Sequence, residues 1–86
     1  MTVHVPSPLH GYTNGRATVE ASGRTLGELL SRLDETHPGF RFRVVDEQGR
    51  IRSTILFYVD GAIVRDLSHS LDGVREVRIV AALSGG

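Results

Sequence analysis

The sequence has no cysteine and no tryptophan, and its ten basic and ten acidic side chains leave it without net charge. Without cysteine the chain cannot form disulfides, thiolate metal sites or a cysteine nucleophile, and it suits a reducing compartment. The balanced charge argues against nucleic acid or an anionic membrane surface as a partner. These absences remove several large function classes before any motif is considered.

Long apolar runs are also missing. The first ten residues, MTVHVPSPLH, lack the basic and then apolar pattern of a secretory signal, and no stretch reaches membrane-spanning length. We therefore expect a cytoplasmic protein without a membrane partner. With 86 residues, of which 40% are apolar, the chain has the size of one small domain. We expect that domain to cover residues 1–82, and residues 83–86 to form a flexible Gly-Gly tail.

The first half of the chain predicts a hairpin followed by a helix. Alternation over residues 3–5 and 16–22, with Asn14-Gly15 between them, indicates two strands joined through a tight turn. Thr25 and Glu28 have the spacing of a capping box, in which each side chain satisfies a free N–H at a helix start. An apolar stripe follows at helical spacing, made of Leu26, Leu29, Leu30 and Leu33. Pro38-Gly39 would end the helix.

The second half predicts mainly strands. Residues 40–45 alternate apolar and arginine side chains, which favours a short extended segment or an edge strand. Residues 55–59 form an apolar run of strand length, and Asp60-Gly61 is a second turn signal. Residues 62–64 would form the returning strand of a hairpin. Residues 66–73 are loop-like, and residues 74–82 predict a last strand. A hairpin, one helix and later strands favour an α+β fold of the β-grasp type, a mixed sheet of four to five strands with one main helix on one face. The last strand would lie centrally, parallel to the first.

Few residues in this scheme suggest catalysis. The four histidines at positions 4, 10, 37 and 69 have no metal-ligand spacing, and we interpret them as surface or capping residues. Ser68, His69 and Asp72 are triad residue types, but sequence neighbours rarely reach triad geometry, so we interpret them as a polar loop. The arginines at 41, 43, 50 and 52 form a modest basic cluster. We interpret them as charges that keep an edge strand soluble, rather than as a nucleic-acid surface.

The last residues of the sequence are the exception. Leu83, Ser84, Gly85 and Gly86 end in two glycines, which contribute almost nothing to a fold. A terminal carboxylate becomes a reactive acyl group only after an enzyme gives it a good leaving group, such as AMP. Two residues without a Cβ give the chain its smallest cross-section, which suits a narrow channel that leads to ATP. They also leave the terminal carbonyl sterically accessible.

Nearly the whole chain resembles the ubiquitin-like sulfur-carrier proteins of the ThiS/MoaD family, in particular the longer members that serve cysteine or thioacid formation. The resemblance is carried by the hairpin start, GRTLGELLSRLDETHPG as the helix, FYVDGAIV as the second hairpin and DGVREVRIVAALSGG as the last strand with its tail. It implies that an ATP-dependent, ubiquitin-activating-like adenylyltransferase adenylates Gly86. A persulfide or sulfide then displaces AMP, and the thiocarboxylate delivers sulfur to a biosynthetic enzyme.

The resemblance further implies a protein co-substrate without an active site or bound cofactor of its own. Gly86 would carry the sulfur, and Leu83, Ser84 and Gly85 would lie in the partner's channel. Apolar side chains on the sheet face away from the helix would dock the partner. The pathway stays open among cysteine, thiamin, molybdopterin and thio-metabolite formation. Two alternatives also stay open: a ubiquitin-like modifier conjugated through Gly86, and a non-catalytic β-grasp interaction module.

Overall fold

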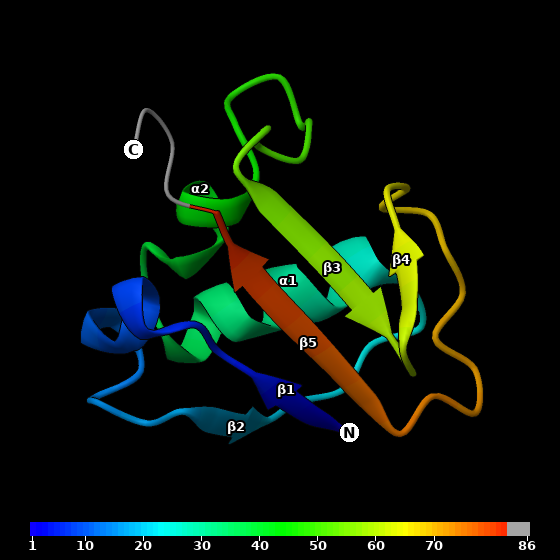
Figure 1. The fold of residues 1–86 in the computed structure, drawn as a ribbon, viewed down its shortest axis with the longest axis horizontal. Coiled ribbons are helices and arrows are strands. Elements are labelled where there is room, and N and C mark those ends of the chain that lie inside the picture. Colours follow the sequence, from blue (N-terminus) through cyan, green and yellow to red (C-terminus); the bar gives the residue numbers. More distant parts are fainter. Residues whose placement is uncertain (83–86) are drawn as a thin grey trace.

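The protein is described by a computed structural model, which places residues 1–82. Its five strands form one mixed sheet in the order β2-β1-β5-β3-β4. Helix α1 crosses one face of this sheet (Figure 1). The elements in chain order are β1 (Thr2–His4), the 3-10 helix η1 (Ser7–Tyr12), β2 (Thr18–Glu20), α1 (Leu26–Thr36), α2 (Phe40–Val44), β3 (Ile55–Val59), β4 (Ala62–Val64) and β5 (Glu76–Ala81). The predicted β-grasp architecture is confirmed, with five strands.

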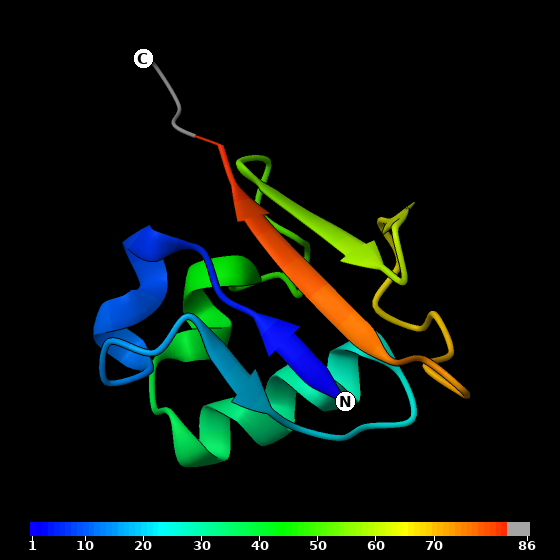
Figure 2. The ribbon, with the colours of Figure 1, turned by 60° about the horizontal axis from the view of Figure 1, so that its bottom comes forward.

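Strands β1 and β2 form the predicted antiparallel hairpin, with Val3 opposite Val19. Its connection is longer than a tight turn, because the 3-10 helix η1 follows β1 directly after Pro6. Asn14 and Gly15 both have positive φ, 55° and 80°, as the Asn-Gly signal requires, but they turn the chain after η1 rather than between the strands. The hairpin therefore carries a helical insertion that the sequence pattern did not show (Figure 2).

Helix α1 is the main helix of the fold. Its four stripe leucines are at most 1% exposed, as the helical spacing predicts. The Thr25 hydroxyl accepts the Glu28 N–H at 3.2 Å, so half of the predicted capping box is present. The other half is absent, because the Glu28 carboxylate pairs with Arg32 one turn further along, at 3.1 Å. The N–H of Leu26, the first residue of the helix, donates to the His69 carbonyl.

The prediction of an extended segment or edge strand over residues 40–45 is wrong: Phe40–Val44 form helix α2. Gly39, at φ 92°, turns the chain after α1. Phe40 and Val44 lie four residues apart and are fully buried, whereas Phe42 is 52% exposed. In a strand Phe40 and Phe42 would share one face, but at helical spacing only the i and i+4 side chains face the core. Burial of two large side chains against α1 outweighs the local alternation.

Strand β5 is central. It pairs parallel with β1, as predicted from the element order, and antiparallel with β3. Strands β3 and β4 turn at Asp60-Gly61, both at positive φ, 45° and 87°. The Asp60 carboxylate accepts the N–H groups of Arg75 and Glu76, which ties this turn to the start of β5. The connection over residues 66–73 has no helix or strand, as expected of a loop.

One hydrophobic core lies between the sheet and the helices. The inward residues of β3 and β5 meet the leucines of α1 there, and Phe40 and Phe57 are its largest fully buried side chains. No helix among residues 1–82 is long and apolar enough to cross a bilayer. The core thus fixes β5 in the middle of the sheet, directly before residues 83–86.

Candidate functional site

The predicted site residues Leu83, Ser84, Gly85 and Gly86 lie outside the residues that the structure describes. The structure does describe their base. Val77 and Ile79 anchor β5 in the core at 0% and 2% exposure. The last described residue, Ala82, donates its N–H to the Thr54 carbonyl at 2.7 Å. The chain therefore leaves the sheet from a strand that β3 holds over residues 77–81 and that β1 holds only up to Arg78.

The sheet face away from α1 carries an apolar patch near the end of β5. Alternation along the strands turns every second side chain to this face. Tyr58 stands opposite both Arg78 and Ile63, and Leu56 stands opposite Val80. We call Leu56, Tyr58, Ile63 and Val80 the outer patch. Ile63 is 48% exposed, and the other three are half-buried. Apolar side chains do lie on this face, and the strand register was needed to name them.

The same face also carries charge beside the patch. Arg78 is exposed next to Val80, and the His4 Nε2 lies 3.2 Å from the Glu76 carboxylate. On the edge strand, Glu20 accepts the Thr2 hydroxyl at 2.7 Å. The outer face is therefore apolar over β3, β4 and the end of β5, and polar over β1 and β2.

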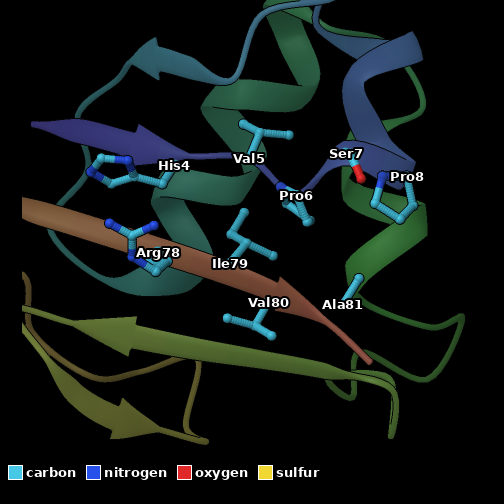
Figure 3. Close-up of a pocket in the computed structure, with 9 residues that line it drawn as sticks. All are labelled: His4, Val5, Pro6, Ser7, Pro8, Arg78, Ile79, Val80 and Ala81. Atoms are coloured by element: carbon cyan, nitrogen blue, oxygen red, sulfur yellow. The ribbon is translucent and has the colours of Figure 1, made fainter. Parts of the chain in front are cut away.

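A groove of about 420 Å³ opens between the end of β5 and the segment after β1 (Figure 3). It forms because the ladder between β1 and β5 ends at His4 opposite Arg78, while β5 continues to Ala81. Pro6 has no N–H with which to extend the ladder, and its carbonyl accepts Leu9 N–H at 2.9 Å to start η1. The groove thus adjoins the residues that lead into the tail.

The four histidines take the roles expected of surface and capping residues. His10 Nε2 lies 2.9 Å from the Val5 carbonyl, His37 caps α1 through its N–H on Leu33, and His69 is exposed. Within residues 1–82, no three His, Asp or Glu side chains are grouped so as to hold a metal ion. The described part of the chain offers no metal centre.

The loop over residues 66–72 is likewise structural. The Asp66 carboxylate accepts both the N–H and the hydroxyl of Ser68, at 2.9 and 2.8 Å. These two hydrogen bonds, with a smaller contribution from the nearby His69 charge, lower the pKa of Asp66. The Ser70 oxygen accepts the Asp72 N–H. Each hydroxyl is thus engaged with its own loop, and no triad geometry links it to His69 in the described residues.

Comparison with known proteins bears on the whole chain, including the residues beyond β5. The ThiS family matches residues 3–86. The chain belongs to the ThiS family. The sulfur carrier protein CysO of Mycobacterium tuberculosis strain H37Rv is 32% identical over 91 residues, which cover 100% of this chain and 98% of the relative. The predicted resemblance is confirmed at the level of the family.

Solved structures agree with this assignment. The crystal structure of M. tuberculosis CysO has a TM-score of 0.88 at 31% identity and covers 95% of this chain and 98% of its own. The CysO chain in the Amycolatopsis orientalis BexX/CysO complex also has a TM-score of 0.88, at 32% identity, covering 99% and 98% of the two chains. SAMP1 from Haloferax volcanii, at 23% identity and a TM-score of 0.76 over 99% and 97%, shares the fold.

Proposed function

We infer that this chain is a sulfur carrier, which holds sulfur as a thiocarboxylate at Gly86. The observation that carries the inference is the extent of the family match, which runs through the fold and on to Gly86. The full-length similarity to CysO sulfur carriers supports it. The chain is then a co-substrate that acts with partner enzymes, and the reacting atom is its own terminal carbon.

The chemistry proceeds in two steps. A carboxylate oxygen of Gly86 attacks the α-phosphorus of ATP on an adenylyltransferase, and pyrophosphate leaves. Sulfide then attacks the acyl carbon and AMP leaves, which gives the thiocarboxylate directly. A protein persulfide in place of sulfide gives an acyl disulfide, and a thiol must reduce its S–S bond to release the same thiocarboxylate. The sulfur atom, polarisable and weakly hydrated, is the better nucleophile for the sulfur-accepting enzyme.

The described residues suit this role by providing a firm base for Leu83, Ser84, Gly85 and Gly86. Strand β5 is central in the sheet, and its inward side chains are buried. A partner that holds the outer patch would therefore hold the start of the tail at a fixed distance from its ATP site. We propose the outer patch as the docking face for the activating adenylyltransferase, since exposed apolar clusters mark interaction sites.

The remaining parts of the proposal concern cofactor and location. ATP would be bound by the activating partner, and the carrier itself would hold no cofactor. A cytoplasmic location follows from the need for ATP and for a sulfide or persulfide source. The sulfur acceptor would be a biosynthetic enzyme of cysteine, thiamin, molybdopterin or thio-metabolite formation.

Intact mass spectrometry tests the proposal. The protein is incubated with ATP, sulfide and a sulfur-carrier adenylyltransferase, and we expect a mass gain equal to the replacement of one oxygen by sulfur. Deletion of Gly86 should abolish the gain. No gain with an adenylyltransferase that loads another carrier under the same conditions would contradict the proposal.

The Gly86→Ala variant probes the need for an uncrowded carbonyl. We expect slower sulfur loading at an unchanged melting temperature, because the added methyl group is bonded to the Cα next to the attacked carbon. Loading of the variant at the rate of the unmutated chain would count against the narrow-channel argument. Higher-mass conjugates on cellular proteins, lost with Gly86, would instead indicate a protein modifier.

A further inference from the structure

The arginines after α1 need a new explanation, because they do not lie on an edge strand. Residues 40–54 contain four arginines (41, 43, 50 and 52) against two acidic residues, Asp46 and Glu47, a net charge of 4 − 2 = +2. The whole chain is neutral, so the remaining residues carry a net charge of −2. Basic charge is therefore concentrated in one segment of an otherwise slightly acidic protein.

Three arginines line one hollow, which we call the arginine hollow. It measures about 300 Å³, and Arg50, Arg52 and Arg65 contribute its basic side chains. Ile55, Leu56 and Val64 supply apolar lining, and no acidic residue lines it. A hollow with an apolar lining and a cationic rim fits an apolar side chain flanked by carboxylates.

Within residues 1–82 no carboxylate forms an ion pair with these three arginines, whereas Arg32 on α1 pairs with Glu28. Arg52 is held in place, because its Nε donates to the Phe42 carbonyl at 2.8 Å and its guanidinium lies 4.6 Å from the centre of the Phe42 ring. Arg50 and Arg65 are exposed. Their forked guanidinium groups match carboxylates in a bidentate manner, which a lysine cannot do.

The arginine hollow lies next to the end of β5. Ile55, in its lining, pairs directly with Ala81, and the neighbouring Thr54 accepts the Ala82 N–H at 2.7 Å. Leu56 belongs both to the hollow and to the outer patch. A partner that engages both the outer patch and the residues after Ala82 would therefore lie close to the arginine hollow.

We propose that the arginine hollow binds an acidic loop of the enzyme that activates Gly86. The loop carries at least two carboxylates around one apolar side chain, and it lies at the rim of the channel that receives the tail. The proposal rests on the proposed sulfur-carrier function, since that function requires such an enzyme. Charge complementarity at an interface rim mainly raises the association rate, so the arginines would speed docking of the tail.

Charge reversal with a matched control tests the proposal. The double variant Arg50→Glu, Arg65→Glu, which we call the hollow reversal, replaces two positive charges of the hollow with negative ones. Arg16→Glu with Arg24→Glu makes the same change in net charge on two exposed residues outside the hollow. Arg16 precedes the edge strand β2, and Arg24 lies beside the loop that contains Ser70 and Leu71. Association of each variant with the immobilised adenylyltransferase is measured by surface plasmon resonance without ATP, so that docking is read separately from sulfur loading. Thermal melts verify that each variant is folded.

We expect the hollow reversal to slow association at least tenfold at about 50 mM salt, with the difference shrinking towards about 500 mM as screening increases. The control pair should stay within about threefold of the unmutated chain. The association rate of the Arg50→Lys, Arg65→Lys variant should lie between the rates of the hollow reversal and the control pair. Lysine keeps the positive charge but lacks the bidentate guanidinium group. Equal effects of the two reversals, or an effect independent of salt, would overturn the proposal.

The outcome is separable from that of the proposed function. If the unmutated chain gains sulfur but the hollow reversal associates normally, only the acidic-loop proposal fails. If the chain binds the adenylyltransferase through the hollow but gains no sulfur, the carrier function fails while the docking site stands. Tight binding of a single-stranded RNA oligonucleotide that the hollow reversal abolishes would replace the acidic protein loop with a nucleic-acid ligand.

Discussion

Helices α1 and α2 pack against each other and line one core, yet they are held in different ways. Helix α1 spans eleven residues, has a side-chain cap at Thr25 and buries four leucines. Helix α2 spans five residues, and its N-cap is the left-handed Gly39, which has no side chain. The Arg41 N–H in its first turn donates instead to the Asp34 carboxylate of α1, at 3.0 Å. Isolated helices of five residues are not stable in water. Helix α2 thus depends on a few tertiary contacts, whereas α1 has its own periodic face.

The largest expected effect separates the two phenylalanines of α2. Phe40→Ala should cost about 4 kcal/mol in free energy of unfolding, because it opens a cavity at a fully buried site. Phe42→Ala should cost about 1 kcal/mol or less, since its ring is half exposed and stacks on Arg52. Urea unfolding of both variants measures the difference. Equal costs would mean that the two rings face the same side, as in a strand.

In α1 the buried surface is shared among several leucines, so truncating one of them should lower the free energy of unfolding somewhat less than truncating Phe40 does. Leu29→Ala or Leu33→Ala should cost about 3 kcal/mol, within the range for buried leucines. Ser31→Ala, exposed on the same helix, is the matched control and should change stability by no more than about 0.5 kcal/mol. A thermal melt left unchanged by both leucine variants would refute the assignment of this face.

The turn between the helices should show a smaller effect. Gly39 has φ 92°, and a Cβ there would lie 3.1 Å from Tyr12 Cε1. Gly39→Ala should therefore cost about 1–2 kcal/mol, from the left-handed backbone and the contact. Gly11→Ala is the control, because no atom lies within 4 Å of its added Cβ. A Gly39→Ala variant as stable as the Gly11→Ala variant would show that the turn tolerates side chains.

The contrast between the helices explains which parts of the fold could be predicted. The leucine stripe of α1 repeats over two turns, β3 is a continuous apolar run of five residues, and β5 alternates over six residues, so each pattern was long enough to predict its element. Residues 40–44 offered only three apolar side chains, which fit a period of two as well as an i and i+4 pair. Tertiary packing decided between these possibilities, and no local signal carries that information.

The candidate site also has one part that could be predicted from the sequence and one part that could not. The tail residues Leu83, Ser84, Gly85 and Gly86 could be singled out because their chemistry is local to the sequence. The outer patch could not, because Leu56, Ile63 and Val80 come from three strands and meet only through the register of the sheet. The arginine hollow was missed for a related reason: assigning Arg50 and Arg52 to an edge strand did not place them in one hollow with Ile55 and Arg65.

The smallest expected effect tests how independent α1 is of its surroundings. Two of its first N–H groups, those of Leu26 and Gly27, donate to carbonyls of His69 and Leu67 in the connecting loop, and only the Glu28 N–H uses the Thr25 hydroxyl. Thr25→Ala should therefore cost about 1 kcal/mol in urea unfolding. Glu28→Ala should cost a few tenths of a kcal/mol, about the worth of an exposed i, i+4 pair with Arg32. If Glu28→Ala cost as much as Thr25→Ala, the reciprocal half of the capping box would be present in solution. If Thr25→Ala cost much less than 1 kcal/mol, the loop at residues 67–69 would hold the start of α1 without the cap, and α1 would then resemble α2 in its dependence on tertiary contacts.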